Sequence, residues 1–172
     1  MAECWELFDR KANPIGQRIR RGDPIPQGAY HKIIGVWTIH TELKRLLTTR
    51  RDFSKLICPG QWENTGGSIL CGETPAYGAA REVREETGLA CEPHELEPIT
   101  YLTTENALVY AYAFRTTADP TSIHLQQGET IDYAWVTLAE LETRMADGSF
   151  ALPEIRQYQA CRPYLEKMLQ GH

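Results

Sequence analysis

Three glutamates, Glu82, Glu85 and Glu86, follow one another at spacings of three and four residues. On an α-helix such residues share an arc of about 100°, so three carboxylates would crowd one face. The like-charged pair Glu82 and Glu86 costs about 0.2–0.5 kcal/mol, and Arg81 beside Glu85 returns a similar amount. Stability therefore does not explain the cluster, which is either a solvated face or a holder for a hard cation such as Mg²⁺.

The segment that carries these glutamates is predicted to be a helix over Pro75–Thr87. Thr74 is a suitable N-cap, proline is favoured at the first helical position, and Gly88 can end the helix. Its small residues recur at helical spacing and can pack closely on a sheet; they are Ala76, Ala79, Ala80 and Val83. The helix is thus expected to present its carboxylates from a rigid support.

The wider spacing resembles a known signature. Gly67, five residues, Glu73, seven residues and then Arg81–Leu89 match G-x5-E-x7-R-E-U-x-E-E-x-G-U, where U is bulky and aliphatic. This is the Nudix box, here residues 67–89. The resemblance implies a three-layer α/β/α sandwich with a mixed β-sheet, in which the box forms a loop, a helix and a loop.

The resemblance also implies roles for the box residues and for Gly66. It makes Glu82, Glu85 and Glu86 metal ligands, joined by a main-chain carbonyl near Gly66 or Gly67, while Arg81 orients a carboxylate and Glu73 supports the site. The implied cofactor is Mg²⁺, for which Mn²⁺ can substitute. The implied reaction is attack of water on the diphosphate linkage of a nucleoside diphosphate derivative or a similar small molecule.

The reaction also needs a general base, whose place varies within the family. Glu86, Glu105 and Glu129 are the candidates, and their spacing does not choose among them. Substrate choice is set outside the box, and the residues there do not identify the substrate. Dimers are common in the family, which leaves a homodimer open.

A second resemblance leads to type I isopentenyl-diphosphate isomerase, which shares the fold. Trp5–Asp9 and Glu129–Trp135 look like the corresponding stretches of that enzyme. Its chemistry depends on a cysteine segment before the helix and on a Glu-x-Glu pair. Here Asn64–Gly67 replaces the first, and the pair reads Glu105-Asn106-Ala107. The chain is therefore interpreted as an isomerase-like Nudix hydrolase, with the isomerase as the alternative.

A non-catalytic nucleotide-binding sensor is the other alternative. Such proteins usually lose a carboxylate of the box, and this chain keeps all four. Retention of the full set favours turnover over simple binding.

Composition and charge set further bounds. The chain has 172 residues, enough for a single domain over residues 1–172, and 42% of them are hydrophobic and 24% charged, as in a globular protein. The net charge of -5 is the wrong sign for a nucleic-acid binder. No signal peptide or membrane span is expected. Five scattered cysteines without a Cys-x-x-Cys pair are read as reduced thiols, so the expected location is cytoplasmic.

The remaining pattern supplies strands and helices for this sandwich. A hairpin is expected at about residues 4–20, around a turn at Asn13–Gly16, and C-terminal helices at about residues 138–170, with Pro163 as a kink or break. Strands are expected at His31–His40, Leu46–Thr49, Trp62–Thr65, Leu108–Phe114 and Tyr133–Val136.

Overall fold

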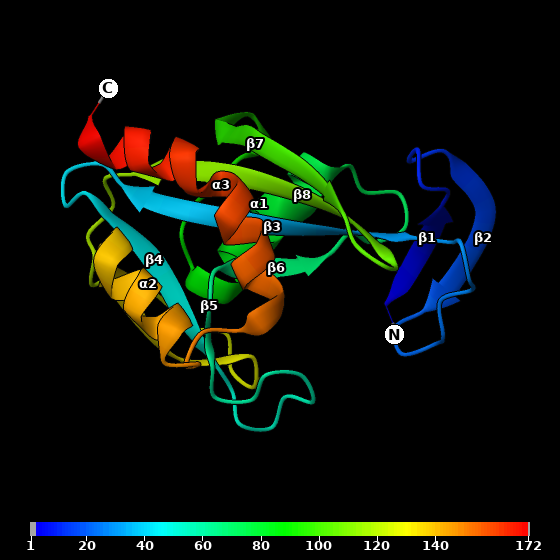
Figure 1. Ribbon diagram of the computed structural model, residues 1–172, viewed down its shortest axis with the longest axis horizontal. Helices are drawn as coiled ribbons and strands as arrows, with labels where there is room; N and C mark the ends of the chain where they lie inside the picture. The colour runs from blue at the N-terminus through cyan, green and yellow to red at the C-terminus, as the bar shows by residue number, and fades with distance from the viewer. Residues whose placement is uncertain (1–2, 172) are drawn as a thin grey trace.

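The structure is a computed structural model that describes residues 3–171. It begins with an antiparallel hairpin of β1 (Cys4–Phe8) and β2 (Pro14–Arg20), which stands at one end of the molecule (Figure 1). The hairpin confirms the prediction, but the turn lies earlier than expected. Oδ1 of Asp9 accepts hydrogen bonds from the amides of Lys11 and Asn13, so the chain reverses before Pro14.

A mixed sheet forms the centre of the molecule. Its main strand order is β5-β4-β3-β8-β7, β6 also pairs with β3, and β9 pairs with β4. The strands are β3 (His31–His40), β4 (Arg45–Arg51), β5 (Trp62–Glu63), β6 (Thr65–Ser68), β7 (Leu96–Thr103), β8 (Ala107–Thr116) and β9 (Thr130–Val136). The strand β3 runs parallel to β8 and antiparallel to β4 and β6. The predicted mixed sheet is therefore confirmed.

The strand β7 was not expected from the sequence. It pairs antiparallel with β8 at the sheet edge, and its register shifts between Pro98 and Thr100. Most of its residues are exposed or half-buried, so it lacks a strong apolar alternation. Proline is tolerated at an edge because the missing amide would otherwise face outward.

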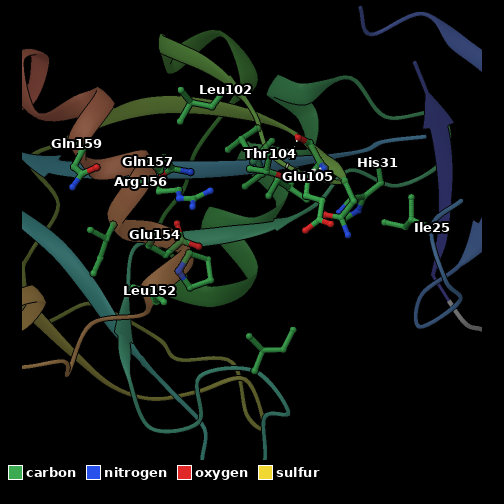
Figure 2. Close-up of a pocket in the computed structure, with 18 of the residues that line it drawn as sticks. Ile25, His31, Leu102, Thr104, Glu105, Leu152, Glu154, Arg156, Gln157 and Gln159 are labelled. Atoms are coloured by element: carbon green, nitrogen blue, oxygen red, sulfur yellow. Dashed lines mark hydrogen bonds between the residues drawn. The ribbon is translucent and has the colours of Figure 1, made fainter. Parts of the chain in front are cut away.

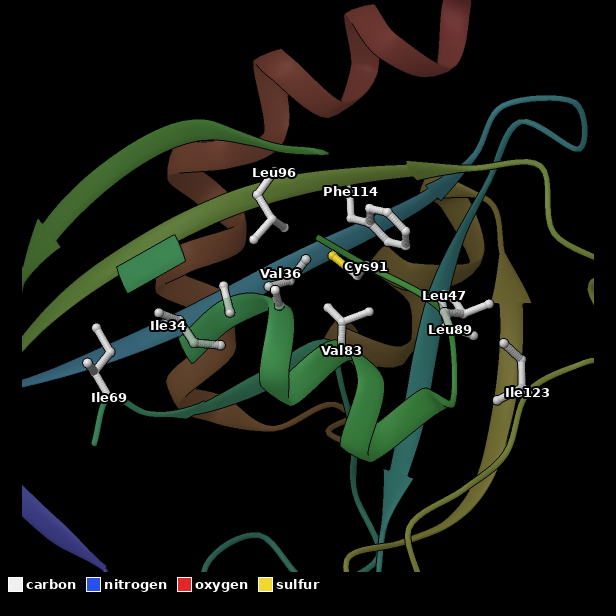
Figure 3. Close-up of a cluster of buried hydrophobic side chains, with 12 residues drawn as sticks. Ile34, Val36, Leu47, Ile69, Val83, Leu89, Cys91, Leu96, Phe114 and Ile123 are labelled. Atoms are coloured by element: carbon white, nitrogen blue, oxygen red, sulfur yellow. The ribbon is translucent and has the colours of Figure 1, made fainter. Parts of the chain in front are cut away.

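Helices cover both faces of the sheet. On one face, α1 (Pro75–Thr87) packs Ala79, Ala80 and Val83 against Ile34 and Val36 of β3, as Figure 3 shows for Val83, Ile34 and Val36. The opposite face of β3 packs on the C-terminal helices through a second cluster that contains Trp37, Ile39, Leu141, Tyr158, Cys161 and Leu165. The three layers agree with the expected α/β/α sandwich.

The C-terminal helices are α2 (Leu138–Ala146) and α3 (Leu152–Gln170), with the short 3₁₀ helix η1 (Pro93–Glu95) after α1. Thr137 and Glu140 form a capping box at the start of α2. Pro163 lies inside α3 and does not end it, so the expected break is absent. Near the start of α3, Oε1 of Gln157 accepts a hydrogen bond from the side chain of Asn64, which lies between β5 and β6.

The cysteines require a correction. The structure joins Cys4 and Cys71 by a disulfide, with Cα atoms 5.5 Å apart, so the expectation of five reduced thiols is wrong for this pair. The bond ties the N-terminal hairpin to the loop that precedes α1. Cys58, Cys91 and Cys161 are free. Within residues 3–171, no helix is both long and apolar enough to cross a membrane.

Candidate active site

The helix α1 begins and ends as the sequence predicts. Thr74 caps it by accepting a hydrogen bond from the amide of Tyr77, and Gly88 ends it in the left-handed conformation with its amide bonded to the carbonyl of Arg84. Because its small residues face the sheet, the side chains one step around the helix lie against the neighbouring strand β6. Glu82 occupies that position beside Gly67, and Glu86 follows it one turn along the helix.

Glycine at position 67 makes room for Glu82. A Cβ on Gly67 would lie 2.1 Å from Oε1 of Glu82, closer than any normal contact. At Gly66 the nearest atom to such a Cβ is the carbonyl oxygen of Ile34 at 3.4 Å, an ordinary contact. The close approach of backbone and carboxylate is therefore specific to Gly67.

Glu86 is the most deeply placed carboxylate of the box. It is 7% exposed, and its Oε2 atom has no hydrogen-bond partner among the described residues. Burial raises its pKa well above the usual range, and the negative charges of Glu63, Glu82 and Glu129 raise it further. Burial also raises the pKa of Glu82 to about 7, partly opposed by Arg81. Because Oε2 of Glu86 has no partner, the charged form of this carboxylate is poorly accommodated.

Arg81 holds the other carboxylates of the box. Its Nε and Nη2 bind the two oxygens of Glu73 at 2.8 and 3.0 Å, a bidentate arrangement. Its Nη1 donates to Glu82 at 2.7 Å and to Glu85 at 3.1 Å. Arg81 thus holds Glu73, Glu82 and Glu85 together, and the roles expected for Arg81 and Glu73 in catalysis stay predictions.

Glu85 differs from its two neighbours. Its side chain is 45% exposed and is paired only with Arg81 among the ion pairs of the described chain. Across residues 3–171, no three His, Cys, Asp or Glu side chains are already gathered as a ligand cage. Glu82 and Glu86 are the two more buried carboxylates of α1. Glu85 would have to break its ion pair with Arg81 before it could share a cation with them.

Two ion pairs that the sequence did not indicate border the box. Arg51 of β4 binds Glu63 of β5 at 2.5 Å, and Lys55 in the following loop binds Glu129. The charges of Glu63 and Glu129 both act on Glu86, which places the two pairs around that carboxylate. Glu129, a predicted candidate for the general base, is thus close enough to Glu86 for its charge to raise the pKa of that carboxylate.

Glu154 in the first turn of α3 is a further carboxylate beside the site. Burial raises its pKa to about 8, and the charge of Glu63 adds to the shift. A Cβ on Gly66 would lie 4.0 Å from Oε1 of Glu154, so this side chain faces the backbone next to the box. The sequence provides no local signal for it, because only the fold brings α3 to this strand.

Glu105 is placed differently from Glu129. It lies in the exposed turn between β7 and β8 and lines a cavity that Glu154 also lines. The charges that most affect Glu86 do not include Glu105. His31 lines the same cavity, and burial lowers its pKa to about 4, so its imidazole is neutral near pH 7.

The raised pKa of Glu154 predicts a pH-dependent stability in metal-free protein. The folded chain holds this proton with a pKa of about 8, against about 4.3 for an unfolded glutamate. The stabilisation is therefore complete below the unfolded value and is lost as the pH rises through the folded one. Urea unfolding in EDTA should show a falling free energy of unfolding from about pH 5 to about pH 9.

The variant Glu154→Gln should make the decrease in the free energy of unfolding with pH less steep. Some decrease should remain, because the raised pKa values of Glu82 and Glu86 act in the same direction. Glu42→Gln, in the exposed turn after β3, is the matched control and should keep the full slope. Identical slopes in the two variants would show that the surroundings of Glu154 do not raise its pKa.

Comparison with known proteins places this site in a family. The family model described as "NUDIX domain" matches residues 29–155. An uncharacterized Nudix hydrolase of Listeria innocua is 27% identical over 149 residues, covering 86% of this chain and 88% of that protein. Isopentenyl-diphosphate Delta-isomerase of Escherichia coli is 30% identical over 144 residues, covering 78% and 77%.

The matched lengths vary among relatives. Nudix hydrolase 3 of Arabidopsis thaliana is 30% identical over 98 residues, which are 56% of this chain and only 13% of that protein. The crystal structure of the Deinococcus radiodurans protein DR0079 superposes with a TM-score of 0.75 at 23% identity, covering 93% of this chain and 98% of the other. That likeness supports the fold. With the family model spanning the sheet, the box helix and the start of α3, this chain belongs to the NUDIX family of hydrolases.

Proposed function

We propose that this chain is a Mg²⁺-dependent hydrolase of the diphosphate linkage in a small molecule, with Mn²⁺ able to replace Mg²⁺. One observation carries the proposal: Glu86 of α1 is buried, and its Oε2 atom has no hydrogen-bond partner among the described residues. Glu82, partly buried beside Gly67, shares its counter-charge Arg81 with Glu73 and Glu85. Isolated buried carboxylates are costly unless something neutralises them. A divalent cation with substrate phosphate oxygens supplies what this arrangement lacks.

The residues present fit such a cation. All the donors are carboxylate oxygens with backbone carbonyls close by, the ligand type that Mg²⁺ prefers. Oε2 of Glu86 is a buried acceptor with no partner, and the space beside Glu82 admits only a glycine backbone. Glu82 and Glu86 would hold the ion, with Glu85 as the third ligand once released from Arg81 and the carbonyl at Gly66 or Gly67 beside them.

Bound there, the cation would neutralise developing charge on the phosphate oxygens and lower the pKa of an attacking water. The chain's own residues do the positioning. Arg81 holds Glu82 and keeps Glu73 against the start of the helix. Arg51 and Lys55 balance the charges of Glu63 and Glu129 around the site.

A carboxylate must also accept the proton of the attacking water. Glu86, Glu105 and Glu129 remain the candidates, and Glu154 joins them. We favour Glu129, because its ion pair with Lys55 fixes its position and its charge acts on Glu86. Glu105 lies in the exposed turn between β7 and β8, beside the cavity, and is the least favoured of the four candidates for the general base.

Two observations weigh against isomerase activity. Cys71, a cysteine near the box, has its Sγ bound to Cys4 and offers no free thiol. Ala107, which stands where the isomerase pair has its second glutamate, is 4% exposed and carries no ligand atom. Retention of the box carboxylates likewise favours a hydrolase over a sensor.

Removal of the metal should abolish turnover. Protein freed of metal with EDTA should release no phosphate or monophosphate product from a panel of diphosphate compounds, and added Mg²⁺ or Mn²⁺ should restore the rate by at least about 10³-fold. Products are separated by ion-exchange chromatography and identified by mass. Turnover that persists undiminished in excess EDTA would overturn the metal-dependent mechanism.

A further inference from the structure

A large cavity adjoins the carboxylate site. It has a volume of about 870 Å³ and lies between the first half of α3 and the starting ends of β3 and β8 (Figure 2). Small-molecule sites usually have volumes of about 300–1,000 Å³. The N-terminal hairpin and the loop after β4 contribute its outer walls through Trp5 and Ile57. The space is large enough for the organic half of a substrate.

The cavity wall is mainly aliphatic. Side chains from six separate parts of the chain share this character: Ile25, Ile33, Ile57, Leu102, Val109, Leu152 and Ile155. Figure 2 shows Leu152 on the α3 side, Leu102 on the β7 side and Ile25 near the hairpin around one space. Such a wall favours an apolar group over one that needs many hydrogen bonds.

The charged lining argues against a second anionic group. Arg156 is the only Lys or Arg among the residues that line the cavity, and its side chain belongs to an exposed position. Glu105 and Glu154 bring carboxylates instead. His31 is neutral near pH 7 and cannot supply a compensating charge. A ligand with phosphate at both ends would be poorly neutralised here.

The aromatic lining also disfavours stacking of a base between two rings. Trp5 and His31 lie against each other, with ring centroids 4.6 Å apart and planes inclined by 33°. Each ring therefore already uses one face, and the opposite walls are aliphatic. Proteins that hold bases without reading their edges generally offer free aromatic faces.

Glu154 connects the cavity to the carboxylate site. It lines the cavity, and on its other side it faces Gly66 and the charge of Glu63. A substrate with its diphosphate at the box would thus direct its organic group along α3. Ile57 and Leu152, which are 67% and 73% exposed, border this path and would be covered by an apolar group.

From this geometry we infer that the substrate is a diphosphate monoester of an aliphatic alcohol, with its hydrocarbon chain in the cavity. The inference rests on the proposed hydrolysis. Water forms a new P–O bond at one phosphorus, and the bond from that phosphorus to the bridging oxygen breaks. The products are the alcohol monophosphate and inorganic phosphate, and the released proton passes to a site carboxylate and then to solvent.

A substrate series separates this inference from the proposed function. Geranyl diphosphate, isopentenyl diphosphate, methyl diphosphate, ADP and ADP-ribose are compared by kcat/KM with Mg²⁺. Geranyl diphosphate should exceed methyl diphosphate and both nucleotides by at least about tenfold. Calorimetric binding of geranyl monophosphate in EDTA gives a second readout that does not depend on turnover.

Variants at the mouth of the cavity test whether the hydrocarbon chain of the substrate binds there. Ile57→Ser and Leu152→Ser should each raise KM for geranyl diphosphate by about tenfold and leave KM for methyl diphosphate within about twofold. Leu56→Ser is the matched control, because Leu56 is 99% exposed beside Ile57 and does not line the cavity. All three positions are exposed, so folding should be retained.

The outcomes are distinct. Faster cleavage of ADP or ADP-ribose than of geranyl diphosphate would overturn the inference and leave the proposed hydrolase intact. Conversion of isopentenyl diphosphate to its isomer without phosphate release, or no cleavage of any diphosphate, would overturn both. If Leu56→Ser raised KM for geranyl diphosphate as much as Ile57→Ser, the proposal that the hydrocarbon chain binds in this cavity would be wrong.

Discussion

Glu86→Gln should lower kcat by about 10³-fold or more and leave the protein folded. The change preserves the shape of the side chain and removes the charge with which it would hold the metal. In metal-free protein the variant should be at least as stable as the parent, because a buried, partnerless carboxylate becomes a neutral amide. Steady-state kinetics and urea unfolding in EDTA measure the two effects separately.

Glu42→Gln serves as the charge-matched control for this variant. Glu42 is exposed in the turn after β3, so its replacement should change neither rate nor stability measurably. Parent-like kcat in Glu86→Gln would show that Glu86 plays no essential part. Loss of rate together with loss of folding in EDTA would show that Glu86 supports the structure instead.

Gly67→Ala should lower kcat/KM by about 10²-fold or more, because a misplacement of about 1 Å at a reacting centre is that costly. The new Cβ would lie 2.1 Å from Oε1 of Glu82. Glu82 can escape only by turning away from the position that Arg81 now fixes. The expected defect is therefore one of metal affinity, seen as a higher Mn²⁺ concentration for half-maximal rate.

Gly66→Ala is the informative comparison for Gly67→Ala. Both changes add one methyl group to β6, but at Gly66 the nearest atom lies at 3.4 Å. Its loss of kcat/KM should stay within about fivefold, well below the cost of a 1 Å misplacement. Equal losses in the two variants would indicate a general disturbance of β6 in place of the specific approach to Glu82.

The sequence was most informative where signals are local. Thr74, Pro75 and Gly88 act through bonds within a few residues, and the bounds predicted for the box helix coincide with α1. The strand His31–His40 is likewise confirmed, because a long run of β-branched and aromatic residues is typical of a buried strand. The membership in the NUDIX family follows from the same local spacing.

The parts that sequence did not supply depend on distant contacts. Glu154 reaches the site only because the start of α3 lies beside β6. Glu63 lies on the short strand β5, which pairs with β4, and neither glutamate occurs in a recognisable pattern. Cys4 and Cys71 are 67 positions apart, and five scattered cysteines do not indicate which two meet. The edge strand β7 escaped prediction because exposure and Pro98 weaken its alternation.

The position of a bound cation tests the central claim most directly. In crystals soaked with Mn²⁺, anomalous scattering should place the ion between the carboxylates of Glu82 and Glu86, with oxygen ligands at the roughly 2.0–2.6 Å typical of hard cations. Glu86→Gln crystals under the same conditions should lose the peak. An ion that binds elsewhere, or a peak that is unchanged in this variant, would contradict the account.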